Sequence, residues 1–172
     1  REIERIKDLL RTNMPGMVYK INCGPKPSLE YVSEGCLALT GYDAPTFKEI
    51  INKSLADPSY LTEYAEYVDL ICHIQRRVAQ ALTSQSPYTY REEFSVVTAQ
   101  GDKKWVLDQG KGLYNDKGEL LALDGLVIDI TDRKEKEEES LFLTNHDTLT
   151  GLYNRFYYQQ ALHKFDRREY LP

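Results

Sequence analysis

Three segments with the character of β-strands, joined by tight turns, fill the second half of this chain and constrain its fold most. They span residues 88–99, 103–115 and 119–130 and are rich in β-branched and aromatic side chains. Gly101 lies in the first connection and Asp116-Lys117-Gly118 in the second, where glycine and aspartate favour tight reversals. Strands joined by so few residues pair antiparallel, so the pattern predicts a β-meander.

The first half of the chain predicts a hairpin followed by helices. Residues 17–22 and 28–32 alternate apolar and polar side chains on either side of a glycine- and proline-rich turn. Short helices are expected at 34–39 and 44–52, and a longer helical pattern covers 59–83. Together with the meander, this order predicts an α+β fold in which a five-stranded antiparallel sheet carries its helices on one face.

Composition excludes several classes of function. A formal charge of -5 argues against a nucleic-acid platform, because phosphate binding draws on concentrated lysine and arginine. Cys23, Cys36 and Cys72 form no CxxC pair, so neither a zinc or other metal site nor a disulfide framework is expected. No apolar stretch approaches the ~18 residues of a membrane span, and no signal-peptide pattern occurs. We therefore expect a cytoplasmic segment without membrane contact of its own.

Short motifs follow one another in a definite order along the second half. They read Pro87-Tyr88-Thr89-Tyr90-Arg91-Glu92-Glu93-Phe94, Gly101-Asp102-Lys103-Lys104-Trp105-Val106, Asp116-Lys117-Gly118, Leu123-Asp124-Gly125 and Asp129-Ile130-Thr131. In this order they resemble a PAS domain of the PAS-PAC type, over roughly residues 12–133. The resemblance implies a sensory domain with a ligand pocket between sheet and helices. His73-Ile74-Gln75-Arg76 departs from the family's common His-Pro-Asp-Asp, so an atypical pocket wall is expected.

The PAS resemblance suggests four residues that could line such a pocket. They are Tyr19, Cys36, Tyr90 and Trp105, although aromatic residues on strands also commonly just pack. Cys36 and Cys72 are better explained as small apolar core residues than as nucleophiles.

The cofactor of a PAS domain is haem, flavin, an organic acid or nothing, and the sequence leaves it open. His73 is a candidate haem ligand, with a surface or helix-end position as the commoner alternative for a histidine. The flavin-binding motif of LOV domains is absent, because Asn22-Cys23 continues into a turn. Haem and flavin are therefore disfavoured, and a small metabolite or no ligand is expected.

A run of charged residues follows the last predicted strand. Residues 132–139 carry charge at every position and are mostly good helix formers, so a helical linker is expected over 132–146. An isolated helix of this length is marginal in water, which favours a homodimer in which a partner helix supplies order. Only Ile130 and Leu141 suggest a coiled-coil face, so a solvated single helix is the alternative.

The residues from 145 to 155 read Asn-His-Asp-Thr-Leu-Thr-Gly-Leu-Tyr-Asn-Arg. They resemble the opening of a GGDEF domain, the catalytic unit of diguanylate cyclases, which condense GTP into cyclic di-GMP. The chain contains no Gly-Gly pair, and the metal-binding and guanine-contacting residues of that family lie beyond the part present here. The resemblance therefore implies a regulatory piece of a diguanylate cyclase that has no catalytic residues of its own.

Two groups of residues are expected to pass a signal along this chain. Asp129, Ile130 and Thr131 lie at the exit from the predicted sheet, and Asp147 and Arg155 lie in the GGDEF-like opening. Two other functions stay open. One is a ligand-free PAS dimerisation module. The other is a sensor of the histidine-kinase kind, because His146 precedes an acidic residue as in phosphoacceptor motifs, although Thr150-Gly151 interrupts the helix there.

These observations divide the chain into four expected parts. Residues 1–13 form an amphipathic helix, 14–131 the PAS sensor, 132–146 the linker and 147–172 the truncated start of a GGDEF domain. An apolar stripe on the last helical pattern is expected to pair with another copy; it comprises Tyr158, Ala161, Leu162 and Phe165. The ends of the chain indicate a piece of a longer polypeptide, whose upstream part could tether it to a membrane.

Overall fold

The computed structural model describes residues 16–57 and 68–165, with side chains described from residue 72 onward in the second range. The chain divides into two compact units, Arg1–Ile130 and Thr131–Pro172. The helix expected at 1–13 and the first part of the helical pattern at 59–83 lie outside the described residues.

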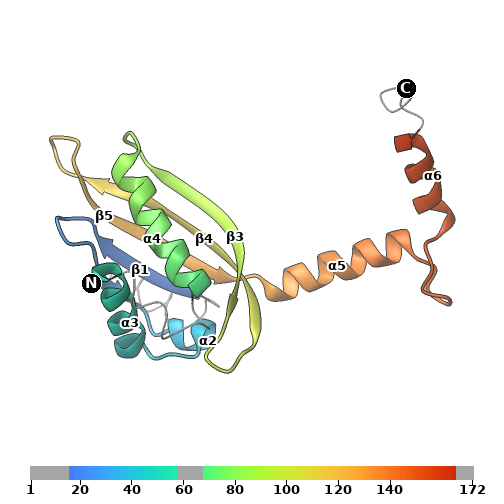
Figure 1. The fold of residues 1–172 in the computed structure, drawn as a ribbon, viewed down its shortest axis with the longest axis horizontal. Coiled ribbons are helices and arrows are strands. Elements are labelled where there is room, and N and C mark those ends of the chain that lie inside the picture. Colours follow the sequence, from blue (N-terminus) through green and yellow to red (C-terminus); the bar gives the residue numbers. More distant parts are fainter. Residues whose placement is uncertain (1–15, 58–67, 166–172) are drawn as a thin grey trace, which may run out of the picture. The chain divides into compact units, whose positions relative to one another are not determined.

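The first unit is built on a five-stranded antiparallel sheet with the strand order β2-β1-β5-β4-β3 (Figure 1). The strands are β1 Gly16–Asn22, β2 Ser28–Val32, β3 Thr89–Val97, β4 Lys103–Tyr114 and β5 Leu120–Asp129. The hairpin and the meander predicted from the sequence are both present. Strand β1 joins them, because it pairs with β2 on one side and with β5 on the other.

Local turn chemistry explains the two reversals of the meander. Gly101 has a φ of 87° and Gly118 a φ of 79°, a backbone conformation that favours glycine. In the β4–β5 turn the side-chain oxygen of Asn115 accepts hydrogen bonds from the backbone amides of Lys117 and Glu119, both at 2.9 Å. These contacts fix the turn and with it the register of β4 against β5.

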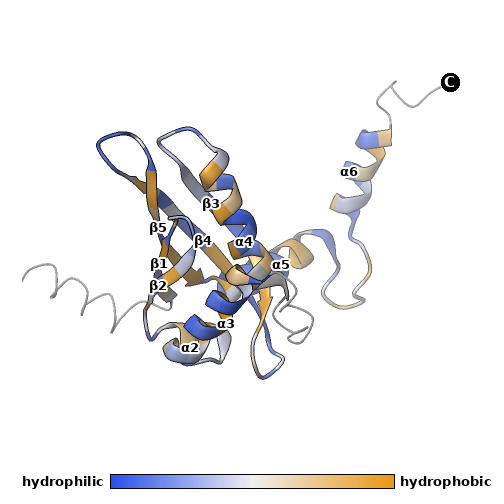
Figure 2. Cartoon of the chain, turned by 60° about the vertical axis from the view of Figure 1, so that its left-hand side comes forward, coloured by the Kyte–Doolittle hydropathy of each residue, from blue (hydrophilic) through white to orange (hydrophobic). Residues whose placement is uncertain are grey.

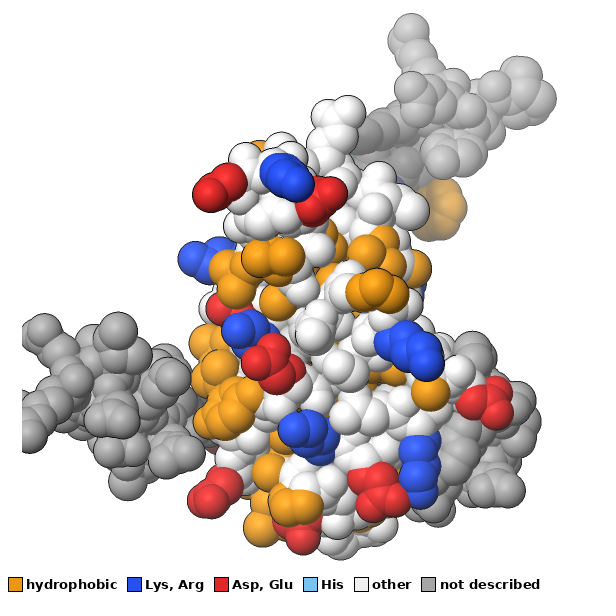
Figure 3. Space-filling view, turned by 90° about the vertical axis from the view of Figure 1, so that its left-hand side faces the viewer, with side chains coloured by type: hydrophobic (Ala, Val, Ile, Leu, Met, Phe, Trp, Pro, Cys, Tyr) orange, Lys and Arg blue, Asp and Glu red, His pale blue; other side chains and the backbone are white. Residues whose placement is uncertain are grey.

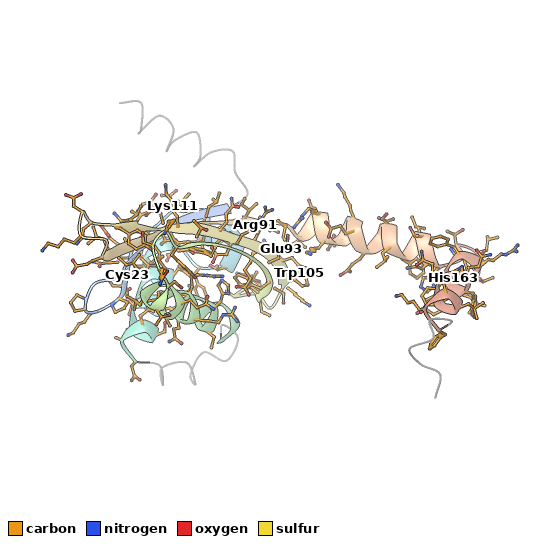
Figure 4. All side chains as sticks on the ribbon, turned by 90° about the horizontal axis from the view of Figure 1, so that it is seen from above. Cys23, Arg91, Glu93, Trp105, Lys111 and His163 are labelled. Carbon is orange, nitrogen blue, oxygen red and sulfur yellow. The ribbon has the colours of Figure 1, made fainter. Side chains whose placement is uncertain are left out.

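Helices α2 (Cys36–Thr40), α3 (Ala44–Ala56) and α4 (Val68–Thr83) lie on one side of the sheet, whereas Arg91 and Lys111 lie on the other (Figure 4). Asp43 caps α3 by accepting a hydrogen bond from the amide of Thr46 at 2.8 Å. Two predicted boundaries are wrong. Helix α2 begins two residues later than expected, and α3 continues beyond Asn52 because Ser54 is fully buried in the core and extends its packed face.

The core lies between the sheet and these helices. Its most deeply buried side chains include Ile21, Leu29, Ile51, Leu123 and Val106. Hydrophilic residues are visible on the outer surfaces of α3 and α4 in Figure 2, as expected for helices with one apolar face. On the face seen in Figure 3, side chains of both charges are interspersed among apolar ones.

The second unit contains α5 (Thr131–Asn145) and α6 (Arg155–Phe165) with a structured turn between them. The linker expected over 132–146 is thus helical through residue 145. None of the helices in the described ranges combines the length and apolar character that a membrane span requires.

Candidate functional site

Two glycines in the middle of the sheet make room for two tyrosine rings. A single row crosses four strands, with Tyr19 opposite Gly125, Gly125 opposite Gly110, and Gly110 opposite Tyr90. A Cβ atom built on Gly125 would lie 2.2 Å from Cζ of Tyr19, and one on Gly110 would lie 2.3 Å from the hydroxyl oxygen of Tyr90. Both rings therefore lie over the space that side chains at these glycines would fill, and their hydroxyl oxygens meet at 2.5 Å.

Asp108 anchors this tyrosine pair. It lies two residues from Gly110 on β4 and so faces the same side of the sheet. The Tyr19 hydroxyl donates to Oδ1 of Asp108 at 2.9 Å. Because a hydroxyl has one proton, Tyr90 then donates to Tyr19. Burial, with the adjacent Asp108 carboxylate, raises the pKa of both tyrosines above the ordinary value, so both stay protonated donors at neutral pH.

His73 closes the network from the helix side. It projects from α4, is 5% exposed, and stacks on the ring of Phe94 with centroids 3.8 Å apart. Its Nε2 lies 3.0 Å from Oδ2 of Asp108, and its Nδ1 lies 3.1 Å from Nη2 of Arg76. Arginine can only donate, so Nδ1 accepts and Nε2 carries the proton that goes to Asp108. The surface or helix-end position weighed for this histidine is therefore wrong, and both ring nitrogens are engaged, which leaves none for haem iron.

Two arginines of α4 continue the network toward solvent. Glu92 on β3 accepts from Arg76 at 2.9 Å through one oxygen and from Arg77 at 2.6 Å through the other. The Arg77 guanidinium is buried and lies over the Tyr90 ring, 4.4 Å from its centroid. A chain of hydrogen bonds therefore runs from the buried Tyr90 through Tyr19, Asp108 and His73 to Arg76, which is exposed.

The network reaches the surface at a depression between α4 and the edge strand β3. Its volume is about 780 Å³. The lining residues are Cys72, His73, Gln75, Arg76, Ala79, Phe94 and Ser95. No group of three side chains suited to hold a metal ion occurs within the described parts of the chain.

The other pocket candidates lie in different places. Cys36 is fully buried on α2 in the same core as both tyrosines, and burial raises the pKa of its thiol to about 11. Trp105 pairs with Ser95 across the sheet and alternates to the face opposite Tyr90, so the structure does not bring it to the network. Cys72 is exposed, which corrects the expectation of a core position: helical geometry turns it away from the adjacent inward-facing His73.

The exit from the sheet is tied to helix α2. Nζ of Lys104 on β4 donates to the carbonyl of Ala38 at 2.7 Å and lies 3.4 Å from Oδ2 of Asp129. Ile130 is buried, and its amide donates to the carbonyl of Trp105 at 2.8 Å. Helix α5 begins at the next residue, Thr131. Of the three residues predicted at the exit, Asp129 and Ile130 are therefore held by contacts within the sheet unit, and Thr131 is the first residue of α5.

The GGDEF-like stretch forms a hydrogen-bonded turn. One oxygen of Asp147 accepts from the amides of Leu149 and Thr150 at 3.1 and 2.9 Å and from the Thr150 hydroxyl at 3.0 Å. The bonds from Thr150 hold the pKa of Asp147 below its usual value. Arg155 is exposed as the first residue of α6, whereas the side chain of Asn154 caps that helix through the Tyr157 amide.

Comparison with known proteins identifies the fold. The N-terminal domain of a diguanylate cyclase with a PAS/PAC sensor from Marinobacter aquaeolei superposes with a TM-score of 0.52, at 19% identity, over 69% of this chain and 98% of that one. The PAS domain of BvgS from Bordetella pertussis gives 0.50 at 19% identity, over 83% and 96%. The first unit has the PAS fold. The tyrosine network therefore lies inside a PAS-fold unit, between its sheet and its helices.

Two further matches cover different shares of the chain. An RNA-binding light-oxygen-voltage receptor superposes with a TM-score of 0.55 at 14% identity, over 95% of this chain and 39% of that one. The uncharacterized protein y4lL of Sinorhizobium fredii is 31% identical over 98 residues, which are 53% of this chain. The chain spans only 12% of the length of that relative. No known family model matches the sequence.

Sequence reasoning missed most of the network in this PAS-fold unit. Asp108, Arg77 and Gly110 were not singled out, and Glu92 and Gly125 were noted only as members of the PAS-like motifs. One signal was available: in the alternation of the second meander strand, Asp108 and Gly110 occupy positions that should face the core. A charged residue and a glycine at such positions indicate a polar partner and a closely approaching side chain.

Proposed function

We propose that the PAS-fold unit is a sensory and regulatory module that controls a diguanylate cyclase through helix α5. The observation that carries the proposal is the order of the parts. Helix α5 starts at the residue after the last sheet hydrogen bond, and the stretch resembling the GGDEF opening follows its last turn. The Marinobacter aquaeolei protein, whose PAS/PAC sensor belongs to a diguanylate cyclase, supports this order. Because GTP is an intracellular substrate, the proposed location is the cytoplasm.

In this proposal the chain itself catalyses nothing. Its role is to set the spacing and orientation of two cyclase domains, because cyclic di-GMP forms only when two bound GTP molecules face each other. A homodimer is therefore part of the proposal. The apolar face of α6 supports pairing, since Tyr158, Leu162 and Phe165 are 58%, 67% and 78% exposed.

The coupling can be tested in the full-length protein by inserting one alanine after Lys134, within α5. The insertion turns everything beyond it by ~100° about the helix axis. We expect cyclic di-GMP synthesis from GTP to change severalfold, whereas insertion of a whole turn of four residues restores most of it. Equal activity in all three proteins would refute coupling through α5. No synthesis by the unaltered protein under any condition would refute the cyclase assignment.

A ligand-free dimerisation module is the second candidate function, and one observation favours it. The tyrosine pair and His73 are buried, and their polar groups bond to one another or to Asp108, so these side chains already fill space that a ligand between sheet and helices would use. Native mass spectrometry of the purified chain separates the two candidates: additional bound mass indicates a metabolite, and the bare chain mass indicates a ligand-free module. The histidine-kinase alternative is tested by incubation with ATP and a search for phosphohistidine at His146.

A further inference from the structure

A series of stacked rings spans the junction between α5 and α6. The ring of His146 stacks on Phe142 of α5 with centroids 4.2 Å apart and an angle of 9°. The His146 ring also contacts the ring of Tyr153, with centroids 4.4 Å apart and an angle of 31°. Tyr153 in turn stacks on Tyr157 of α6 at 3.9 Å. The last turn of α5, the connecting turn and the first turn of α6 are therefore joined through one continuous column of side chains centred on His146.

Hydrogen bonds hold the same junction. Nδ1 of His146 lies 2.9 Å from the carbonyl oxygen of Gly151, which can only accept, so Nδ1 carries the proton. The amide of Asp147 donates to the Leu152 carbonyl at 2.7 Å, and the amide of Asn154 donates to the Asn145 carbonyl, also at 2.7 Å.

These bonds also serve the end of α5. The carbonyl groups of the last turn of a helix have no partner within the helix, and a turn that supplies donors to them becomes part of the helix end. Here the carbonyl of Asn145 accepts from the Asn154 amide, and the carbonyl of Thr144 accepts from the Asn154 side chain at 2.8 Å. One residue, Asn154, thus closes α5 and caps α6.

We propose that the column centred on His146 makes the α5–α6 junction a rigid elbow. A glycine-containing turn of this kind would otherwise let the two helices move independently. With the elbow in place, a rotation of α5 carries α6 with it. His146 is a positioning residue that acts through Phe142 and Tyr153. The use of the elbow in signalling rests on the proposed function, but the rigidity is a property of this chain alone.

The direct test is to measure residual dipolar couplings of the α5 and α6 amides by NMR in the whole chain. We expect one alignment tensor to fit both helices in the unaltered protein. In the His146→Ala variant, which removes the ring and the side-chain donor, each helix should need its own tensor. His163→Ala is the matched control, because it removes the same side chain from an exposed position on α6, and it should keep the single tensor.

Two further variants separate the contributions. His146→Phe keeps a stacking ring without the Nδ1 donor, and His146→Asn keeps a polar side chain without the ring. If stacking dominates, His146→Phe retains the single tensor and His146→Asn loses it. Hydrogen exchange at the Asp147 and Asn154 amides should rise roughly 10-fold in His146→Ala, because two aromatic contacts are lost, while exchange in the sheet stays unchanged and shows that the PAS-fold unit is intact.

Several outcomes would overturn the elbow. Separate tensors in the unaltered chain would do so, as would a single tensor in His146→Ala or equal loosening by His163→Ala. In full-length protein that carries His146→Ala, the one-residue insertion in α5 should no longer change the rate of cyclic di-GMP synthesis. A full-length protein that makes no cyclic di-GMP contradicts the proposed function and leaves the NMR result on the elbow standing.

Discussion

Replacement of Gly125 by alanine should destabilise the PAS-fold unit far more than an added methyl group ordinarily does. The new Cβ would lie 2.2 Å from Cζ and 2.5 Å from the hydroxyl oxygen of Tyr19. The Tyr19 ring cannot swing away without cost, because it is 5% exposed and its hydroxyl is bonded to both Asp108 and Tyr90. The ring must shift within a packed core and stretch or break these bonds.

The magnitude follows from two costs. Overpacking of a core costs about 1–3 kcal/mol. Weakening the hydrogen bond to the Asp108 carboxylate adds about 1 kcal/mol, because bonds to charged groups contribute ~1.5–3 kcal/mol and only part is lost. The free energy of unfolding should therefore fall by about 2–4 kcal/mol, which for a chain of this size lowers Tm by roughly 5–15 °C.

The assay is urea denaturation followed by the fluorescence of Trp105, the single tryptophan, which reports on the PAS-fold unit. Gly24→Ala is the matched control, since its Cβ would meet only the Asn22 side chain, at 3.2 Å, and it should change stability by less than about 1 kcal/mol. The decisive comparison repeats Gly125→Ala in a Tyr19→Ala background, where the clash is gone. An equal loss in both backgrounds would refute the reasoning, because the two positions would then be uncoupled.

Two further predictions concern ionisable groups. Burial raises the pKa of Tyr19 and Tyr90 in the folded state above the ordinary 10.0, so above pH ~10 only the unfolded chain releases these protons, and the free energy of unfolding should fall by about 1.4 kcal/mol per pH unit for each tyrosine. In Tyr19→Phe the fall in the free energy of unfolding above pH ~10 should be smaller by about 1.4 kcal/mol per pH unit than in the unaltered chain, and an unchanged slope would contradict the assignment. A thiol-specific reagent should modify exposed Cys72 in the native chain, whereas Cys23 and Cys36 react only after unfolding; rapid native modification of all would contradict their burial.

The strands and the turns of the meander were predictable because their signals are local. Gly101 and Gly118 adopt the positive φ that their positions in the sequence indicated, and the strands end within one or two residues of the expected bounds. Helix boundaries failed where tertiary packing decides them. The extension of α3 past Asn52 depends on Ser54 being enclosed by the core, which no local pattern reports.

The network was not predictable because it depends on register between distant segments. Tyr19 and Asp108 are 89 residues apart in the chain, and only the pairing of β1 with β5 and of β5 with β4 brings them together. His73 likewise joins the network only because it lies on the side of α4 that faces the sheet. Lys104 also reaches α2 and Asp129, contacts that no local pattern reports.

Strand β4 connects the interior network with the exit from the sheet. Asp108 and Lys104 are separated by four positions on this strand, so their side chains project from the same face. Asp108 holds Tyr19 and His73, and Lys104 holds α2 and Asp129. His73 and Arg76, which line the surface depression, are thus connected to Asp108 by hydrogen bonds. Strand β4 therefore contacts both the interior network and Asp129, which lies two residues before the start of α5 at Thr131.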